Sequence, residues 1–202
     1  MALTESTMLK LGSPAPDFSL AATDRSIVSK SDFVGKPLLV MFICNHCPFV
    51  KHLAGQLKSV ADDYMDRVGV VGIQSNDTQA YPDDSFEKMK EEVDSRCYAF
   101  PYLWDEDQTV AKAFTAACTP DFFLFDSAHA LVYRGRFDET RPTRIKSGVY
   151  DSTQTPATGK EIRAAIDAVL AGSQPSEKQY PAMGCNIKWT PGNEPDYFSA
   201  TS

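Results

Sequence analysis

The sequence predicts an α/β fold in which a central mixed β-sheet is covered by helices on both faces. Residues 36–43 are almost continuously apolar, which is typical of a strand that is buried on both sides. From Phe49 onward the apolar positions recur every three to four residues, which indicates an amphipathic helix. Two apolar segments at 121–126 and 130–137 flank a short polar turn, which predicts an antiparallel hairpin in the same sheet.

The elements between these segments follow in chain order. Residues 12–18 contain two prolines, so we expect an extended lead-in rather than a helix. The first helix is expected to end near Arg67, and residues 68–73 repeat the pattern of a buried strand. Pro82 and the two acidic residues after it predict the start of a second helix, and a short third helix is expected over residues 108–116.

The C-terminal part of the chain predicts one more helix and a tail. Residues 138–158 show no apolar period and are interpreted as a loop, and Thr158 is expected to cap a last helix that ends near Ala171. We therefore expect a domain over residues 1–172 and an extension over residues 173–202. The middle of this extension is expected to pack on the domain and its last few residues to be held loosely. Its apolar residues are Cys185, Ile187 and Trp189.

Length and charge limit the classes of partner. The chain has 202 residues, with 20 Lys and Arg against 27 Asp and Glu, so its formal net charge is −7. An acidic balance disfavours nucleic acid and anionic membranes as partners. No apolar run approaches the ~18 residues of a membrane span. The N-terminus lacks the cationic start and apolar stretch of a secretory signal, so we expect a cytoplasmic protein.

Two of the five cysteines, Cys44 and Cys47, lie at the junction of the first buried strand and the first helix. Proline is favoured at the first helical position because it has no N–H to satisfy, so Pro48 marks the helix start and Cys47 its N-cap. A thiolate there accepts unpaired backbone N–H groups and faces the positive end of the helix dipole. Both effects lower the thiol pKa and predict a nucleophile. Cys44, in the preceding turn, is within reach of a disulfide with Cys47.

The remaining cysteines leave alternatives open. Cys118 is interpreted either as a small buried residue or as a resolving thiol, and Cys185 as a thiol that folds back from the extension to resolve. A zinc site built on the Cys-x-x-Cys pair is a further alternative. Its other ligands would come from His46, His52, Cys118 or Cys185. Because the sequence holds no second closely spaced pair of ligands, we expect no metal.

A likeness to a known fold rests on the Cys47-Pro48 step between strand and helix and on Thr119-Pro120 just before the Phe-rich strand. This combination resembles the thioredoxin fold. The resemblance implies a three-layer α/β/α architecture and a cis bond before Pro120. It also implies that Thr119 and Pro120 shape a surface that docks an extended substrate backbone.

More narrowly, the sequence is similar to the peroxiredoxin-like branch of the alkyl hydroperoxide reductase/thiol-specific antioxidant family. The similarity runs from Gly12 to about residue 172, and segments 133–138 and 184–189 also resemble this branch. It implies a redox-active cysteine without a nucleotide, flavin or metal cofactor.

Two positions depart from the peroxiredoxin pattern. Cys44 stands where these proteins carry Thr, three residues before the nucleophile. Peroxiredoxins also carry a peroxide-binding Arg just before the strand of the later hairpin. This sequence has Thr119-Pro120-Asp121 there, as thioredoxins do. The resemblance therefore implies that disulfide exchange exceeds peroxide reduction.

Two arginines are alternative sources of the missing group. The strand that begins at Asp121 leaves the predicted active-site edge and its partner returns there, so the 138–141 loop should end near Cys47. Arg136 or Arg141 would then supply a cation to the thiolate. The other interpretation of both side chains is solvated charge in a loop.

These features predict a thiol-disulfide oxidoreductase in which Cys47 is the nucleophile and Cys44 the resolving thiol. Its substrates would be protein or small-molecule disulfides, and its reductant a cellular thiol such as thioredoxin or glutathione. One alternative is a thiol-dependent peroxidase with antioxidant activity. Another is a redox-inactive module that only binds a peptide in the groove beside Cys47 and Pro120.

Overall fold

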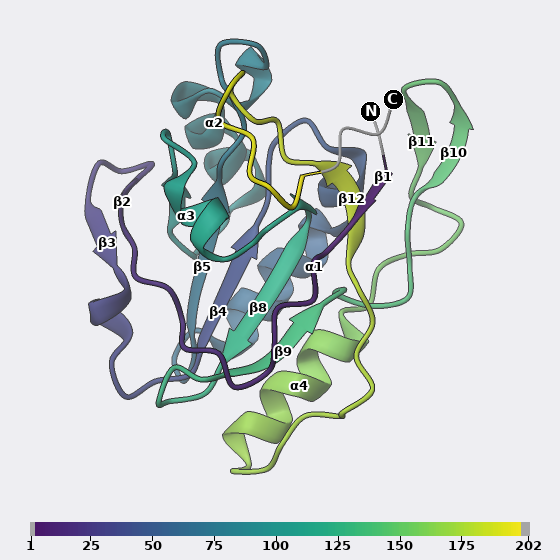
Figure 1. Cartoon of the computed structure of the whole chain (residues 1–202). Helices are drawn as coiled ribbons and strands as arrows, with labels where there is room; N and C mark the ends of the chain where they lie inside the picture. The colour runs from purple at the N-terminus through teal and green to yellow at the C-terminus, as the bar shows by residue number, and fades with distance from the viewer. Residues whose placement is uncertain (1–2, 199–202) are drawn as a thin grey trace.

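The computed structural model describes residues 3–198, and within them the main β-sheet has seven strands in the order β3-β2-β6-β5-β4-β8-β9 (Figure 1). At its centre, β4 (Leu38–Phe42) pairs in parallel with β5 (Gly69–Gln74) and antiparallel with β8 (Asp121–Phe125). Strand β9 (Leu131–Gly135) pairs antiparallel with β8 and completes the predicted hairpin. The predicted mixed sheet is therefore confirmed.

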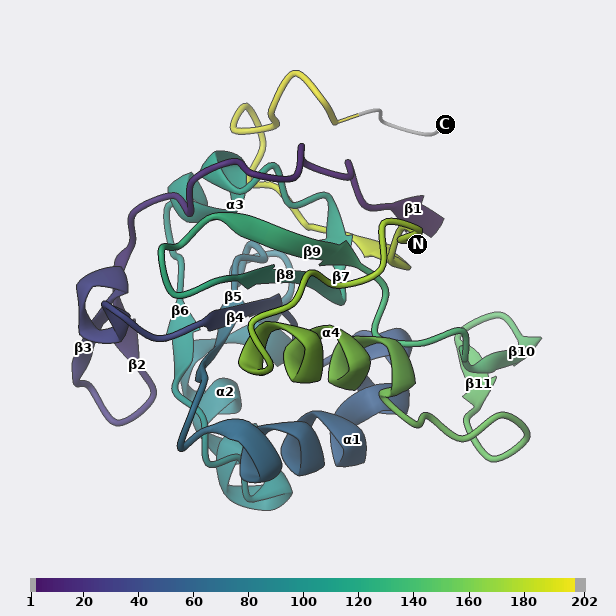
Figure 2. The ribbon, with the colours of Figure 1, turned by 90° about the horizontal axis from the view of Figure 1, so that it is seen from below.

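Helices cover both faces of this sheet (Figure 2). On one face lie α1 (Pro48–Tyr64), α2 (Phe86–Arg96) and α4 (Lys160–Leu170), and on the other lies the short α3 (Thr109–Ala113). The predicted three-layer architecture is confirmed. In the part of the chain that the structure describes, no helix combines the length and the apolar character that crossing a membrane requires.

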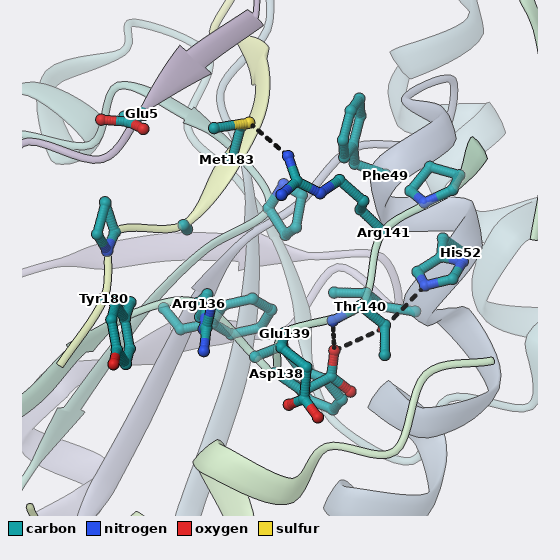
Figure 3. A pocket seen from close by; sticks show the side chains of 17 residues that line it. Glu5, Phe49, His52, Arg136, Asp138, Glu139, Thr140, Arg141, Tyr180 and Met183 are labelled. Atoms are coloured by element: carbon teal, nitrogen blue, oxygen red, sulfur yellow. Dashed lines mark hydrogen bonds between the residues drawn. The ribbon is translucent and has the colours of Figure 1, made fainter. Parts of the chain in front are cut away.

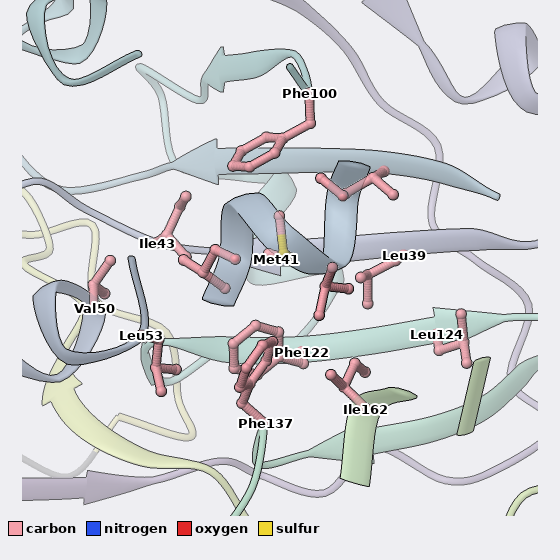
Figure 4. Close-up of a cluster of buried hydrophobic side chains, with 14 of the residues drawn as sticks. Leu39, Met41, Ile43, Val50, Leu53, Phe100, Phe122, Leu124, Phe137 and Ile162 are labelled. Atoms are coloured by element: carbon pink, nitrogen blue, oxygen red, sulfur yellow. The ribbon is translucent and has the colours of Figure 1, made fainter. Parts of the chain in front are cut away.

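The central strand β4 shows why its sequence is apolar throughout. Leu39 and Met41 belong to the cluster beneath α1 and α4, whereas Leu38, Val40 and Phe42 belong to the cluster on the α3 side. Figure 4 shows the first of these clusters, with side chains of the sheet among those of the helices. Because successive residues of a strand face opposite sides, a strand covered on both sides buries every side chain, and each position of β4 is apolar.

Several short strands are not evident from the sequence. β6 (Tyr102–Trp104) pairs in parallel with β5, and β2 (Ser19–Ala22) pairs antiparallel with both β6 and β3 (Ile27–Ser29). A 3-10 turn, η1 (Lys30–Phe33), follows β3. Strands of three or four residues are too short to show an alternation, so tertiary pairing defines them.

The segment at 138–158 is not the irregular loop that the sequence predicts. Strands β10 (Thr143–Lys146) and β11 (Val149–Asp151) form a two-stranded antiparallel hairpin that projects from the body of the protein (Figure 1). Its side chains are mostly exposed, so no alternation of apolar and polar residues marks it in the sequence.

The N-cap of α4 is Gly159 and not the predicted Thr158. Gly159 has a left-handed φ of 67°, and a Cβ there would lie 2.9 Å from a ring carbon of Phe137, so glycine fits best. The carboxylate of Asp138 accepts the backbone N–H groups of Thr158 at 2.7 Å and of Gly159 at 2.8 Å. A side chain from another segment therefore supports this helix start, where the sequence suggested a local cap.

Much of the segment 173–198 lies against the rest of the chain. Strand β12 (Met183–Asn186) lies between β1 (Leu3–Glu5) and the two-residue β7 (Cys118–Thr119), antiparallel to both. Ile187 and Trp189 are buried in the cluster on the α3 side. The expectation of loosely held last residues falls on 199–202, which lie outside the described residues. The division into a domain over 1–172 and an extension stays a prediction.

Candidate active site

Cys47 lies where β4 gives way to α1. It is the N-cap of the helix, with an extended backbone (φ −66°, ψ 124°), and Pro48 occupies the first helical position. The carbonyl of Cys47 accepts the N–H of Lys51 at 3.0 Å, which begins the helical hydrogen-bond ladder. The predicted N-cap position is confirmed, and the side chain is fully buried.

Thr119 connects the two cysteines of the Cys-x-x-Cys pair. The Sγ of Cys44 lies 3.3 Å from Thr119 Oγ1, and the Cys47 thiol donates to Thr119 O at 3.2 Å. The bond between Thr119 and Pro120 is cis, as predicted. The structure thus brings Cys44, Cys47, Thr119 and Pro120 together, with both cysteines in the thiol form.

The surroundings of Cys47 favour its thiolate. Burial alone would raise the pKa of the Cys47 thiol, but hydrogen bonds from the Cys185 and Cys44 thiols and from the backbone of Val50 and Cys185 hold it well below its usual range. The thiol's own bond to Thr119 O favours the neutral form and is lost on ionisation. The donors from Cys185, Cys44 and Val50 nevertheless keep the pKa of Cys47 low, which is what a reactive thiolate needs.

The other buried cysteines are held as thiols. Burial and the hydrogen bond to Cys47 raise the pKa of Cys44, and the charge of Asp84 raises it further. Burial raises the pKa of Cys118, and the hydrogen bond to Cys47 together with burial raises that of Cys185. Among the buried cysteines of the described residues, the lowered pKa therefore belongs to Cys47.

Asp84 holds the cysteine loop and is absent from the sequence prediction of the site. It ends the 3-10 turn η2 (Pro82–Asp84), and its fully buried carboxylate accepts the backbone N–H groups of Asn45 at 2.8 Å and of His46 at 3.2 Å. Asn76 Nδ2 donates to the same carboxylate at 2.8 Å. In the sequence, Pro82 and the acidic pair after it signal only a helix start, and nothing there indicates a contact with a loop 38 positions away.

The same carboxylate belongs to a group of potential metal ligands. Cys44, His46 and Asp84 each place one ligand atom within 4.8 Å of the others. His46 Nδ1 lies 2.6 Å from Asp84 Oδ2, and backbone N–H groups already donate to this carboxylate, so hydrogen bonds account for the cluster. It differs from the zinc site considered from the sequence, because it contains Asp84 and not Cys47. His52 is directed to Thr140, at 3.0 Å.

Cys118 and Cys185 lie on paired strands close to Cys47. The thiol of Cys118 donates to Pro120 O at 3.5 Å, so its sulfur is directed along its own segment. Cys185 faces Thr119 in the β12–β7 pairing and hydrogen-bonds Cys47. The expectation that Cys185 folds back from the extension to the active site is confirmed in its geometry, while a resolving role stays a prediction.

A cavity of about 310 Å³ lies beside Pro120 and the first turns of α1. The 138–141 loop forms one wall of it, and His52 Nε2 lies 3.0 Å from Thr140 Oγ1 across this wall (Figure 3). The predicted approach of this loop to the Cys47 end of α1 is therefore confirmed. The buried Cys47 itself does not line the cavity.

The two arginines considered from the sequence line this cavity (Figure 3). Arg136 Nε donates to both carboxylate oxygens of Glu161 at 3.0 Å, and its guanidinium stacks 4.2 Å from the ring centre of Tyr180. Arg141 Nη1 lies 3.5 Å from Met183 Sδ. Within residues 3–198, these contacts direct both guanidinium groups to partners other than the Cys47 sulfur.

Comparisons with known proteins agree with this architecture. Residues 11–134 match the AhpC/TSA family. The crystal structure of an uncharacterized conserved protein from Geobacillus kaustophilus is 47% identical with a TM-score of 0.87, and the match covers 95% of this chain and 98% of that chain. A hypothetical protein from Sinorhizobium meliloti 1021 is 44% identical with a TM-score of 0.86, over 94% of this chain and 100% of that chain.

A more distant likeness supports the fold. The thioredoxin domain of a thiol-disulfide oxidoreductase from Bacteroides vulgatus has a TM-score of 0.55 at 20% identity, over 66% of this chain and 90% of that chain. A search of curated proteins finds no match. The fold is thioredoxin-like, and the family match ends before α4 and the C-terminal extension.

Proposed function

The chain belongs to the AhpC/TSA family, and we propose that it acts as a thiol-disulfide oxidoreductase with Cys47 as nucleophile and Cys44 as resolving thiol. Membership of this family supports a thioredoxin-like redox function. The observation that carries the finer assignment is the contrast among the buried thiols. The pKa of Cys47 is lowered by hydrogen bonds that outweigh its burial, while burial and the neighbouring Cys47 raise that of Cys44.

The proposed reaction has two thiol-exchange steps. The Cys47 thiolate attacks one sulfur of a substrate disulfide, forming a mixed disulfide and releasing the other sulfur as a thiolate. Cys44 then attacks the Cys47 sulfur, its proton passing to a released substrate thiolate, which frees the second substrate sulfur and leaves a Cys44–Cys47 disulfide. Two electrons pass from the dithiol to the substrate. A thiol reductant returns the pair to its starting form.

The positions of two side chains favour disulfide exchange over peroxide reduction. Cys44 lies in the same Thr119 contact network as the nucleophile, so its effective concentration at the mixed disulfide is high. Arg136 is paired with Glu161, so it is not available to polarise a peroxide at Cys47. A thiol-dependent peroxidase is the alternative that family membership supports.

We further propose protein or small-molecule disulfides as substrates and a cellular thiol such as thioredoxin or glutathione as reductant. A cytoplasmic location suits this chemistry, because a reducing compartment keeps all of the thiols available. The acidic net charge of −7 supports neither nucleic acid nor an anionic membrane as partner.

The test compares reduction of insulin disulfides and consumption of hydrogen peroxide by the wild type, Cys47→Ser and Cys97→Ser. Serine is a good N-cap, so Cys47→Ser should stay folded and lose all thiol activity. Cys97 is exposed at the end of α2, so Cys97→Ser should retain it. Activity in Cys47→Ser would remove the assigned nucleophile, and a folded wild type without turnover would favour the peptide-binding module.

A further inference from the structure

The edge of β7 beside the active site is already paired with a strand of the same chain. In the antiparallel β12–β7 register, Cys185 faces Thr119 and Asn186 faces Cys118. Within residues 3–198, β7 belongs to a three-stranded sheet in the order β1-β12-β7, so β12 is the strand that pairs with it. Thr119 is also the residue that contacts both active-site sulfurs. Any extended substrate that uses this edge meets β12 first.

Gly184 fits closely against the peptide group before Pro120. A Cβ at Gly184 would lie 2.0 Å from Thr119 O, 2.7 Å from Thr119 C and 3.1 Å from Pro120 Cδ. The obstructing atoms are mainly backbone, which cannot turn aside as a flexible side chain does. Residue 184, which precedes Cys185, therefore has to be glycine for β12 to pair with β7 in this way.

Cys185 meets Cys47 where the sulfur of a bound substrate would have to lie. Its thiol and its backbone N–H both donate to Cys47, and both side chains are buried, with exposed fractions of 3% for Cys185 and 0% for Cys47. The extension thus helps to stabilise the thiolate and also covers it. Cys47 is fully buried in this arrangement, so a reagent or a substrate disulfide needs the segments around it to rearrange, and β12 is one of these segments.

We propose that Met183–Asn186 is an intramolecular pseudosubstrate of the redox site. It pairs with β7 as an extended polypeptide would, and it presents Cys185 to Cys47 as a substrate presents its cysteine. The inference deepens the proposed function and rests on Cys47 as nucleophile. The substrate class that follows is an extended polypeptide with a disulfide whose attacked cysteine is preceded by glycine. The substrate polypeptide competes with β12 for the edge of β7.

The first test measures alkylation of Cys47 by iodoacetamide against pH in the full-length protein, with each cysteine resolved by peptide mass spectrometry. The plateau rate at high pH reports how accessible the thiolate is, and the midpoint reports its pKa. Gly184→Ala should displace β12, raise the plateau rate at Cys47 by about tenfold or more, and move the midpoint upward because the Cys185 donors are lost.

Gly55→Ala is the matched control, because a Cβ at Gly55 meets nothing within 4 Å. It should keep both values of the wild type. A folded Gly184→Ala with the wild-type plateau would overturn the proposal. If Gly184→Ala does not fold, the test uses the wild type alone. Its Cys47 should reach an alkylation rate at high pH at least about tenfold below that of the exposed Cys97. Equal rates would contradict the covering role of β12.

The second test addresses the substrate class. Two oxidised peptides that differ only in Gly–Cys against Val–Cys are compared for kcat/KM in the wild type. We expect a preference for Gly–Cys of about tenfold or more, because a side chain at this position meets the Thr119 backbone. Equal values would refute this part of the inference. Failure of the proposed function is distinguishable, since it would show as retained insulin reduction in Cys47→Ser.

Discussion

Nδ1 of His46 lies 2.6 Å from Oδ2 of the buried Asp84, so the turn that carries Cys44 and Cys47 is tied to the segment after β5. The other carboxylate oxygen accepts the backbone N–H groups of Asn45 and His46. His46 also stacks on Tyr81, with ring centres 5.6 Å apart. One buried carboxylate thus fixes the cysteine turn by hydrogen bonds and acts on the Cys44 thiol through its charge.

Asp84→Asn should lower the pKa of Cys44. Burial and the bond to Cys47 are the larger causes of the raised pKa of Cys44, and the negative charge of Asp84 adds to them, so a neutral amide removes this charge effect. The pH profile of Cys44 alkylation, measured in a Cys47→Ser background, should shift to lower pH. Asp83→Asn is the control, since Asp83 is exposed. An unchanged or higher midpoint in Asp84→Asn would contradict the assigned charge effect.

Cys44→Ser should stop the reaction after its first step. Cys47 keeps its donors from Val50 and Cys185, so it should still attack a disulfide, but the mixed disulfide then lacks its nearest resolving thiol. Intact-mass spectrometry of the protein after mixing with oxidised glutathione should show a stable adduct. Normal turnover would mean that another thiol resolves. The double variant Cys44→Ser, Cys185→Ser then shows whether that thiol is Cys185.

The fold could be predicted where a long segment shows one pattern of apolar residues along its length. The run ending in β4 and the helical period of α1 extend over many residues, so their patterns identify them. β6 and the β10–β11 hairpin could not be found in this way, because three or four residues show no period and the hairpin is mostly exposed. Their existence depends on pairing partners distant in the chain.

The candidate site also has parts that could be predicted from the sequence and parts that could not. Cys47 as N-cap follows from Pro48 alone, because the cause is local to one helix start. The roles of Asp84 and of Gly184 arise from tertiary contacts, and residue type alone does not predict them. Thr158 was the reasonable local candidate for an N-cap, but a carboxylate from Asp138 supports the helix start from outside.

Asp138→Asn should destabilise the protein at neutral pH and much less in acid. Burial would raise the pKa of Asp138, but hydrogen bonds from Thr140, Thr158 and Gly159 lower it. A carboxyl whose folded pKa lies below its unfolded value of about 3.9 stabilises the fold above that value and loses the contribution as pH falls through the folded pKa.

Urea unfolding should therefore show a loss of about 1–2 kcal/mol for Asp138→Asn near neutral pH, and a smaller loss at about pH 3. Glu139→Gln serves as control, since this neighbour is exposed and is expected to change little. A loss for Asp138→Asn that is constant over this pH range would show that the charged form is not what the hydrogen bonds stabilise.

The rate at which hydrogen peroxide oxidises Cys47 decides between the two reactions open to this family. A fast peroxidase needs donors that polarise the bound peroxide as its O–O bond breaks. Here burial raises the pKa of Cys47, and the groups that lower it are thiols and backbone N–H groups. Arg136 is held by Glu161, and Arg141 lies against Met183. We therefore expect a second-order rate no higher than that of free cysteine at the same thiolate fraction, since Cys47 is also buried.

The measurement is stopped-flow oxidation of the reduced protein, with Cys47→Ser as the blank and the thiolate fraction taken from the alkylation profile. A rate larger by several powers of ten would mean that a cation reaches the sulfur when peroxide binds. Arg141 is then the stronger candidate, because it has no carboxylate partner among the ion pairs of the described residues, whereas Arg136 would first have to leave Glu161. Arg141→Ala should abolish such a rate, while Arg144→Ala, in the exposed β10, should leave it unchanged.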